Sequence, residues 1–448
     1  MLFKNRISLQ SGFCTKDEFD LAQRVTAACY QTGDPIFKAG FFGAGAVESV
    51  YGHGWFSIDY ACIIDGAKWL DFGLARDFNR NMIDSQFEDG RIRLDTNDTH
   101  KASEKGLVVG CDAVSSLPQV FETAYRVAVM AGDGQLMRGT YTLLRRALDW
   151  WFRNRQDPGT KLITAVTEET FIANHVSPPM VYAPMDTNAF LIRGCENTAL
   201  LAERLGEERD ARELRAKRAE LIDAFETYLW NEEEGAYYPY LITRGEQYRA
   251  LLWHTFLGFA FTDAARRKKL VRLLLDHSHF NWDTYPVTSV SKRDKLFTEA
   301  RSGFGPGYCS VDPSWRGSIW MPSNIFVLEA LERGGRKDLA ADLALKTVRI
   351  FSNYRLGEFA NPITGIPEGL TMSYGWTAAG YLQVILEKLL GIDYTPEAGL
   401  TVRPNLPVDC PEAYRYISLD GLAVPDGRLA DIRIERDDVR ILFRDKKA

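Results

Sequence analysis

Residues 310–324 bring together the kinds of side chain that hold a sugar ring in a protein. The run Trp315-Arg-Gly-Ser-Ile-Trp320 contains two indoles and a guanidinium, and Asn324 follows one helical turn later. An indole can cover the C–H face of a pyranose, and the planar groups of Arg316 and Asn324 can bind its hydroxyls. These four residues are therefore candidates for a carbohydrate site. The alternative is a helix start with buried tryptophans.

A second requirement for carbohydrate chemistry is a carboxyl group that can donate a proton. Cleavage of a glycosidic bond needs two carboxyl groups, one protonated to assist the leaving oxygen and one charged to activate water or attack carbon. Asp186 is the candidate acid, because it follows a loop rich in proline and aromatic residues and opens an apolar segment. The alternative is that Asp186 is a helix N-cap, the commonest role of an aspartate at a helix start.

Glu358 is the candidate base. It lies in the loop Gly357-Glu-Phe-Ala-Asn-Pro-Ile-Thr-Gly365, between two segments with helical periodicity. A solvated loop glutamate is the alternative role for Glu358. Glu368, a few residues later, is a competitor for the role of base, and spacing alone does not separate the two.

The elements that must position these residues are mostly helices. From residue 17 to about 392, apolar residues recur at helical spacing between loops rich in glycine, proline and aromatics. The expected helices cover residues 18–29, 57–82, 117–131, 134–153, 186–205, 210–230, 247–259, 263–276, 322–333, 337–353 and 374–390. They form about six hairpins without a short exact repeat. We therefore expect an all-α fold, an (α/α)6 barrel whose loops converge on one end.

The last residues have a different pattern. Around residues 400–403, 416–419, 431–436 and 439–443, apolar residues alternate at period two and are interrupted by proline and glycine. This pattern predicts short strands. We expect a catalytic domain over residues 1–392 and a small β-rich segment over residues 393–448 that packs on the barrel, because so short a segment buries too little surface to fold alone.

Composition narrows the possible partners. The chain has 448 residues, of which 46% are hydrophobic and 25% charged, and a net charge of −6 without a basic cluster, so nucleic acid is not an expected partner. We expect no membrane span, signal peptide, metal or cofactor, and the composition gives no oligomeric state. The seven cysteines are scattered and form no Cys-x-x-Cys pair, which favours reduced thiols and a cytoplasmic location.

Three ordered motifs resemble the C-terminal signature of glycoside hydrolase family 63. They are Trp315-Arg-Gly-Ser-Ile-Trp320 with Asn324, Glu358-Phe-Ala-Asn-Pro-Ile-Thr-Gly365, and Tyr374-Gly-Trp-Thr-Ala378. Upstream, Met185-Asp-Thr-Asn188 resembles the family motif Met-Asp-Asn-Ser, whose aspartate is the general acid. The family includes α-glucosidases and the mannosylglycerate and glucosylglycerate hydrolases. The resemblance implies inverting hydrolysis of a small α-linked glucoside or mannoside, with Asp186 as acid and Glu358 as base.

The resemblance also implies further sugar-binding residues. Trp55 and Asp59 stand where the family has an aromatic residue and an aspartate that help to hold the sugar, although both could instead form a buried helix start. Asp89 lies in a Gln-x-x-Asp-Gly turn that is common in helical-barrel glycosidases, where it is a ligand or only a turn residue. Trp376 and Glu368 complete the expected sugar-binding set.

Two departures keep other functions open. The order Thr187-Asn188 differs from the family pattern, and Leu400-Thr-Val-Arg-Pro resembles the C-terminal strands of rhamnosidase-like and debranching-type enzymes. A rhamnosidase-type enzyme is thus one alternative. A sugar epimerase or isomerase on the same fold is another, although the six histidines are scattered. The third is an inactive carbohydrate-binding protein.

Overall fold

The computed structural model describes residue 3 and residues 6–96, 113–172, 181–298, 315–352, 354–411, 414–436 and 438–445. Within these ranges the chain is rich in helices, consistent with an α/α toroid, and it ends in strands. Apart from two predicted helices, the expected helical segments agree with the structure to within a few residues. The predicted C-terminal strands are also confirmed.

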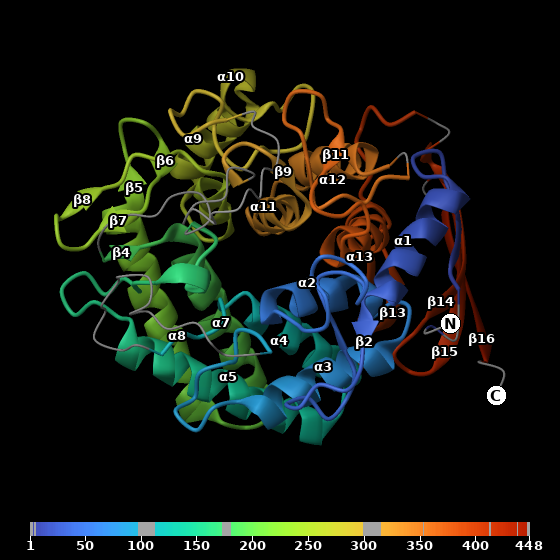
Figure 1. Ribbon diagram of the computed structural model, residues 1–448, viewed down its shortest axis with the longest axis horizontal. Coiled ribbons are helices and arrows are strands. Elements are labelled where there is room, and N and C mark those ends of the chain that lie inside the picture. The colour runs from blue at the N-terminus through green and yellow to red at the C-terminus, as the bar shows by residue number, and fades with distance from the viewer. Residues whose placement is uncertain are drawn as a thin grey trace.

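The helices lie in two concentric layers around a common centre (Figure 1). In the described part of the chain, the inner layer consists of α2 (Ser57–Ala67), α4 (Val120–Ala131), α7 (Met185–Arg204), the 3₁₀ segment η4 (Trp253–Ala260), α11 (Met321–Arg333) and α13 (Gly375–Gln383). Each of these contacts the next, and α13 contacts α2, so the ring closes.

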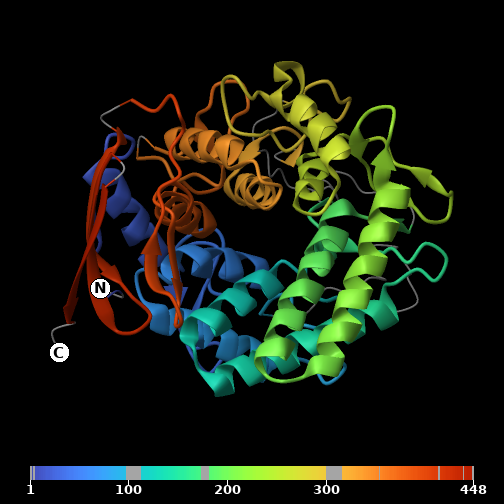
Figure 2. The ribbon, with the colours of Figure 1, turned by 180° about the vertical axis from the view of Figure 1, so that it is seen from behind.

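The outer layer covers this ring (Figure 2). It contains α1 (Lys16–Ala28), α3 (Phe72–Ser85), α5 (Gly134–Asn154), α8 (Glu208–Ala224), α9 (Ala264–Leu275) and α12 (Lys337–Ile350). Three shorter helical segments, α10 (His277–Phe280), η3 (Phe225–Leu229) and η6 (Val384–Leu389), extend neighbouring helices. Burial separates the layers: every residue of α2 is buried, whereas α9 buries only Leu270 and Leu274. A helix that is apolar on all sides belongs inside, and one with a single apolar stripe belongs outside.

The inner ring closes tightly between α2 and α13. A Cβ atom built on Gly66 would lie 2.0 Å from the carbonyl oxygen of Ala379. Only glycine allows the two backbones to approach this closely.

The longest strands form one sheet at the edge of the ring, in the order β1 (Ser8–Gln10), β14 (Tyr416–Ala423), β15 (Arg428–Glu435) and β16 (Asp438–Asp445). All its pairs are antiparallel, and Ser8 lies opposite Asp420. The N-terminal strand therefore joins the C-terminal sheet. A hairpin of β12 (Ile392–Thr395) and β13 (Gly399–Val402) precedes this sheet and contacts α4.

Short strands brace the loops between the helices. β9 (Ile319–Trp320) and β11 (Pro367–Glu368) flank β10 (Phe359–Ala360), with Phe359 opposite both Trp320 and Glu368. The other short pairs join β2 (Tyr30–Gln31) to β3 (Phe41–Phe42), β5 (Trp230–Asn231) to β6 (Ala236–Tyr237), and β7 (Tyr240–Leu241) to both β4 (Tyr182–Ala183) and β8 (Glu246–Gln247).

Two predicted helices are wrong in their bounds. The segment 57–82 is two helices, because Asp71 begins a new one by accepting a hydrogen bond from the Gly73 amide at 2.9 Å. The segment 247–259 becomes helical only at Trp253. Before it, the Leu251 amide donates to Asp294, and Leu252 pairs with Val290. These tertiary bonds override the local apolar periodicity.

Two further findings concern the cysteines and whether a helix could cross a membrane. The cysteines of the described residues, Cys14, Cys29, Cys62, Cys195 and Cys410, are buried free thiols. Among the described helices, none combines the length and the apolar character that crossing a bilayer requires.

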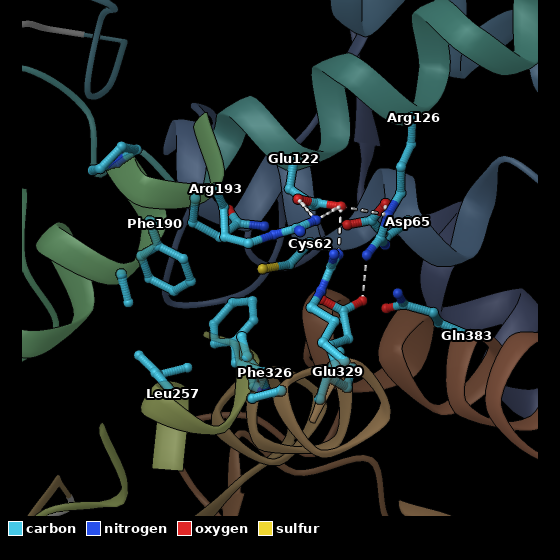
Figure 3. Close-up of a pocket in the computed structure, with 18 of the residues that line it drawn as sticks. Cys62, Asp65, Glu122, Arg126, Phe190, Arg193, Leu257, Phe326, Glu329 and Gln383 are labelled. Carbon is cyan, nitrogen blue, oxygen red and sulfur yellow. Dashed lines mark hydrogen bonds and ion pairs between the residues drawn. The ribbon is translucent and has the colours of Figure 1, made fainter. Parts of the chain in front are cut away.

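A pocket lies among the inner helices. Trp376, Phe190 and Phe326 line it, and a cluster of charged side chains surrounds Glu122 (Figure 3). Glu122 accepts hydrogen bonds from Arg193 at 2.9 Å, Arg333 at 3.0 Å and Asn197 at 2.8 Å.

Arg126 links this carboxylate to its neighbours. It lies 3.4 Å from Glu122 and also pairs with Glu329 and Asp65. The cluster thus ties α4 to α2, α7 and α11, with each cation matched by carboxylates.

Replacing Glu122 by alanine is expected to destabilise the fold by about 3–5 kcal/mol, because the three guanidiniums that converge on it lose a buried partner. Although burial opposes this, the guanidiniums of Arg193, Arg333 and Arg126 hold the pKa of the Glu122 carboxyl well below its ordinary value. A depressed carboxyl pKa stabilises the fold above the unfolded value of about 4.3 and ceases to do so as the pH falls through the folded value. Urea unfolding at pH 7 and at lower pH measures both effects.

The matched control is Glu397→Ala. Glu397 forms a surface ion pair with Arg204 and is 64% exposed, so its removal should destabilise the fold far less than removal of Glu122, because solvent screens the pair. Equal losses in the two variants would show that the cluster does not stabilise the ring.

Candidate active site

The predicted site residues gather where the inner helices begin. Asp59 is in the first turn of α2, Asp186 in that of α7, and Trp376 in that of α13, while Trp320 directly precedes α11. The rings of Trp320 and Trp376 lie 5.8 Å apart, and Asp59 accepts a hydrogen bond from Tyr374, the N-cap of α13. For α2, α11 and α13, these contacts agree with the expectation that the loops meet at one end.

Asp186 is fully buried and is held by a neighbouring segment. Its Oδ1 accepts a hydrogen bond from the Thr170 hydroxyl at 2.7 Å, and its Oδ2 accepts one from the Phe171 amide at 2.6 Å. Burial raises the pKa of Asp186 to about 6, while these hydrogen bonds act in the opposite direction. The N-cap of α7 is Pro184, so the alternative role of Asp186 as the N-cap is wrong.

A buried ion pair fixes the segment that holds Asp186. The Arg155 guanidinium, at the end of α5, donates to both oxygens of Glu169, at 2.8 and 2.9 Å. Glu169 also accepts from the amides of Ser115 and Val166. These bonds anchor the residue directly before Thr170 and Phe171, so that the two donors to Asp186 are positioned by the rigid core.

Glu358 is buried, with 6% of its surface exposed, and the alternative of a solvated loop residue is therefore wrong. Its Oε1 accepts a hydrogen bond from the Tyr51 hydroxyl at 2.6 Å, and its Oε2 accepts one from the Leu370 amide at 3.2 Å. A Cβ atom on Gly369, at φ 131°, would lie 2.4 Å from the Cβ of Glu358. Glycine is required there for the backbone to pass beside the carboxylate.

Asp59 is close to Glu358. Its Oδ1 accepts a hydrogen bond from the Tyr374 hydroxyl at 2.9 Å, and the rings of Tyr374 and Tyr51 lie 5.3 Å apart. Burial raises the pKa of Asp59 to about 7, and the negative charge of Glu358 raises it further, against the hydrogen bond from Tyr374. Asp59 thus gains a proton at a pH at which an exposed aspartate is ionised.

An aromatic wall connects the two candidate catalytic carboxyl groups. From Phe171, whose amide binds Asp186, the ring contacts lead to Trp315 at 5.7 Å, from Trp315 to Trp376 at 6.4 Å, and from Trp376 to Tyr374 at 5.1 Å. Trp320 stacks on Trp315 with centroids 3.8 Å apart and is 1% exposed. Trp320 therefore supports Trp315 from within the protein.

A family model described as the mannosylglycerate hydrolase MGH1-like glycoside hydrolase domain matches residues 51–377. The chain belongs to this family. The matched residues include Asp186, Glu358 and the whole aromatic wall between them.

Relatives of this MGH1-like domain carry related names. A mannosylglycerate hydrolase of Rubrobacter radiotolerans is 30% identical over 202 residues, which are 45% of this chain and 43% of the relative. A probable mannosyl-oligosaccharide glucosidase of Schizosaccharomyces pombe is 28% identical over 200 residues, which are 40% of this chain and 23% of the relative. The chain thus matches less than half the length of either relative.

Among solved structures, the GH63 mannosylglycerate hydrolase from Thermus thermophilus in complex with Tris has a TM-score of 0.65 at 17% identity. It covers 82% of this chain, which in turn covers 99% of it. At this identity the likeness shows the fold alone. Together with the family model, it confirms the resemblance to family 63 that the motifs indicated.

Two other predicted residues of the MGH1-like domain, Trp55 and Asn324, are bonded within the protein. Trp55 is 1% exposed, donates to Asp34 at 3.0 Å and stacks on Phe37. Asn324 uses both amide hydrogens on the carbonyl oxygens of Val287 and Trp320, so it fixes the start of α11. Asn324 thus fixes the backbone of Trp320, which supports the aromatic wall, whereas Trp55 packs on Phe37.

Three other predicted residues, Glu368, Asp89 and Arg316, contact residues outside the carboxyl pair. Glu368, on β11, is half-buried, and its Oε1 lies 3.5 Å from the Asn361 amide nitrogen. Asp89 is exposed in a turn, where it binds the amide and guanidinium of Arg91. Arg316 is half-buried, and its carbonyl accepts from the Thr298 amide at 2.7 Å. The preceding motif residues 177–180 and 310–314 lie outside the described residues.

Sequence reasoning missed Tyr51, Thr170, Tyr374 and His254. Tyr374 stands within a quoted motif, but nothing in the pattern indicated a bond to Asp59 from so distant a segment. Tyr51 and Thr170 stand in segments without a distinctive pattern. Their roles depend on the closure of the ring, which brings distant loops together. Among the described residues, no group of three or more metal-ligating side chains is arranged to hold an ion.

Proposed function

We propose that this MGH1-like domain hydrolyses a small α-linked glucoside or mannoside with inversion, using Asp186 as general acid and Glu358 as general base. The observation that carries the proposal is the buried Asp186, whose raised pKa suits a proton donor. An aromatic wall leads from its segment to a second buried carboxyl group, Glu358, which Tyr51 and the Leu370 amide hold in place.

In this mechanism the proton of Asp186 passes to the glycosidic oxygen as the bond to the anomeric carbon breaks. Glu358 removes a proton from a water molecule that attacks that carbon from the opposite face. Trp315 would cover one face of the sugar, and Asp59 and Arg316 would bind its hydroxyls. Glucose and mannose as the sugar agree with the names of two relatives, and the α linkage follows from the family resemblance.

We also propose that the closed helical ring is an (α/α)6 barrel over residues 1–392, with residues 393–448 as a β-rich unit packed on it. The contacts between successive inner helices support the first part. The pairing of β1 with β14 supports the second, because it ties this unit to the start of the chain.

The test is the release of free sugar from a panel of α- and β-linked glucosides, mannosides, galactosides and rhamnosides, including trehalose and glycerate conjugates. Proton NMR of the first product should show the β-anomer from an α-linked substrate. Rhamnose release alone would favour the rhamnosidase-type alternative, and interconversion of free sugars without hydrolysis would favour an isomerase. The α-anomer as first product would contradict inversion, and tight binding without turnover would contradict hydrolysis.

A further inference from the structure

A buried histidine faces the candidate acid from the next helix of the ring. His254, the second residue of η4, is fully buried, and its Nε2 lies 3.7 Å from Oδ2 of Asp186, which is equally buried. Its ring stacks on Trp253, with centroids 4.0 Å apart. The indole of Trp253 packs in turn on Phe326 of α11. The imidazole is therefore held in place beside the carboxyl group.

In the described part of the chain, titratable groups that interact around this pair lie on β4 and on the segment that carries Glu168 and Glu169. Tyr182 on β4 interacts with Asp186 and with Glu168 and Glu169 on η2 (Thr167–Glu169). Arg155 neutralises Glu169 through two hydrogen bonds. The described surroundings of the pair thus include the neutralised Arg155–Glu169 ion pair, the phenol of Tyr182, the Glu168 carboxylate and the ring of Trp253.

We propose that Asp186 and His254 titrate as one electrostatically coupled pair that holds a single proton, and that His254 is a positioning residue that keeps the general acid loaded. The proposal rests on the function proposed above. His254 touches neither the sugar nor the leaving group, and its effect is exerted only through the carboxyl group of Asp186.

The physical basis is the net charge of a buried pair. With one proton the pair is neutral, whether the proton is on the carboxyl group or on the imidazole. With two protons it carries a positive charge, and with none a negative charge. Burial penalises both charged states. The one-proton state is therefore stable over a wider pH range than a protonated aspartate alone, and the two groups titrate as a unit.

This arrangement serves the proton-donating step of catalysis. That step fails at high pH, because the general acid has then lost its proton. While the proton of the pair is on Oδ2, it can pass to the glycosidic oxygen as the C–O bond breaks. The water proton taken by Glu358 returns to solvent, and the pair regains one proton from solvent. Atoms and charges balance without a bond to His254.

The test compares pH profiles of kcat/KM for the wild type, His254→Phe and His254→Gln. Phenylalanine keeps the stacking on Trp253, and glutamine keeps a hydrogen-bonding group, but neither holds a proton. On methyl α-glucoside or methyl α-mannoside, the alkaline limb should move down by about one pH unit in both variants. On the matching α-glycosyl fluoride, whose leaving group needs little protonation, the limb should not move. Coincident limbs on the methyl glycoside would overturn the proposal, and so would a shift upwards.

A second measurement does not depend on activity. In protein labelled with ¹⁵N-histidine, His254 should lose its ring proton at a lower pH in Asp186→Asn than in the wild type, because the variant removes the carboxylate that is coupled to it. An unchanged titration would overturn the proposal even in an active enzyme. If the wild type cleaves no glycoside but the titration moves, the proposed hydrolysis fails while the coupling of the pair stands.

Discussion

Asp186→Asn is expected to lower turnover of an alkyl glycoside by about two to four orders of magnitude, the usual effect of removing a general acid. Asparagine fills nearly the same volume; its single oxygen can still accept from the Phe171 amide, and its NH2 group can donate to the Thr170 hydroxyl, so the fold should persist. What it lacks is the proton for the leaving oxygen. Steady-state kinetics of sugar release, with circular dichroism to confirm folding, measure the effect.

The chemistry of the leaving group separates loss of the acid from general damage. With an α-glycosyl fluoride, which departs with little protonation, Asp186→Asn should recover most of its activity. The matched control is Asp223→Asn, an exposed position on the outer helix α8, which should leave turnover unchanged. Near-normal hydrolysis of the alkyl glycoside by Asp186→Asn would remove Asp186 from the mechanism.

The helix-rich ring was largely predictable, because its evidence is local. Apolar residues at helical spacing mark α7, α11 and α12 to within three residues at each end, and the alternating pattern marks β14 to β16. The wrong helix bounds occur where hydrogen bonds to residues far away in the sequence fix the backbone conformation. Leu251 and Leu252 continue an apolar periodicity, yet Asp294 and Val290 hold them extended. No local pattern contains those partners.

Local sequence likewise predicts some features of the candidate site and not others. Asp186 and Glu358 stand in motifs that the sequence displays, and both prove to be buried and bonded. The tryptophan pair was expected to offer two faces to a sugar, but Trp320 instead stacks on Trp315. The spacing of two aromatic residues does not say whether they face a ligand or each other. That depends on the pairing of Trp320 with Phe359 on β10.

The position of His254 beside Asp186 is the feature of the site that the sequence predicts least. A lone histidine at the start of an apolar segment is usually a core residue, and nothing near it in the sequence contains a carboxyl group that it could serve. The closure of the ring places η4 next to α7, and only then does the imidazole meet Asp186. The chemistry of this site is thus distributed over helix starts that are far apart in the chain.

Glu358→Gln is expected to lower turnover by about two to four orders of magnitude, because the amide cannot take a proton from the attacking water. The oxygen of glutamine can still accept from the Leu370 amide, and its NH2 group can donate to the Tyr51 hydroxyl, so the surrounding bonds are largely kept. Unlike the loss of the acid, this loss should persist with an α-glycosyl fluoride, since a better leaving group does not activate water. The two substrates therefore distinguish the two carboxyl groups.

Glu368→Gln decides between the two neighbouring glutamates. Its side chain lies toward Asn361, whereas Glu358 is bonded to Tyr51 and acts on Asp59. We expect Glu368→Gln to lose less than about tenfold in turnover, because glutamine keeps the size of the side chain and its oxygen can still accept from the Asn361 side-chain amide. A larger loss in Glu368→Gln than in Glu358→Gln would transfer the role of base to Glu368. Equal losses in both, with the fluoride also unreactive, would show that the short sheet carrying them acts as a unit.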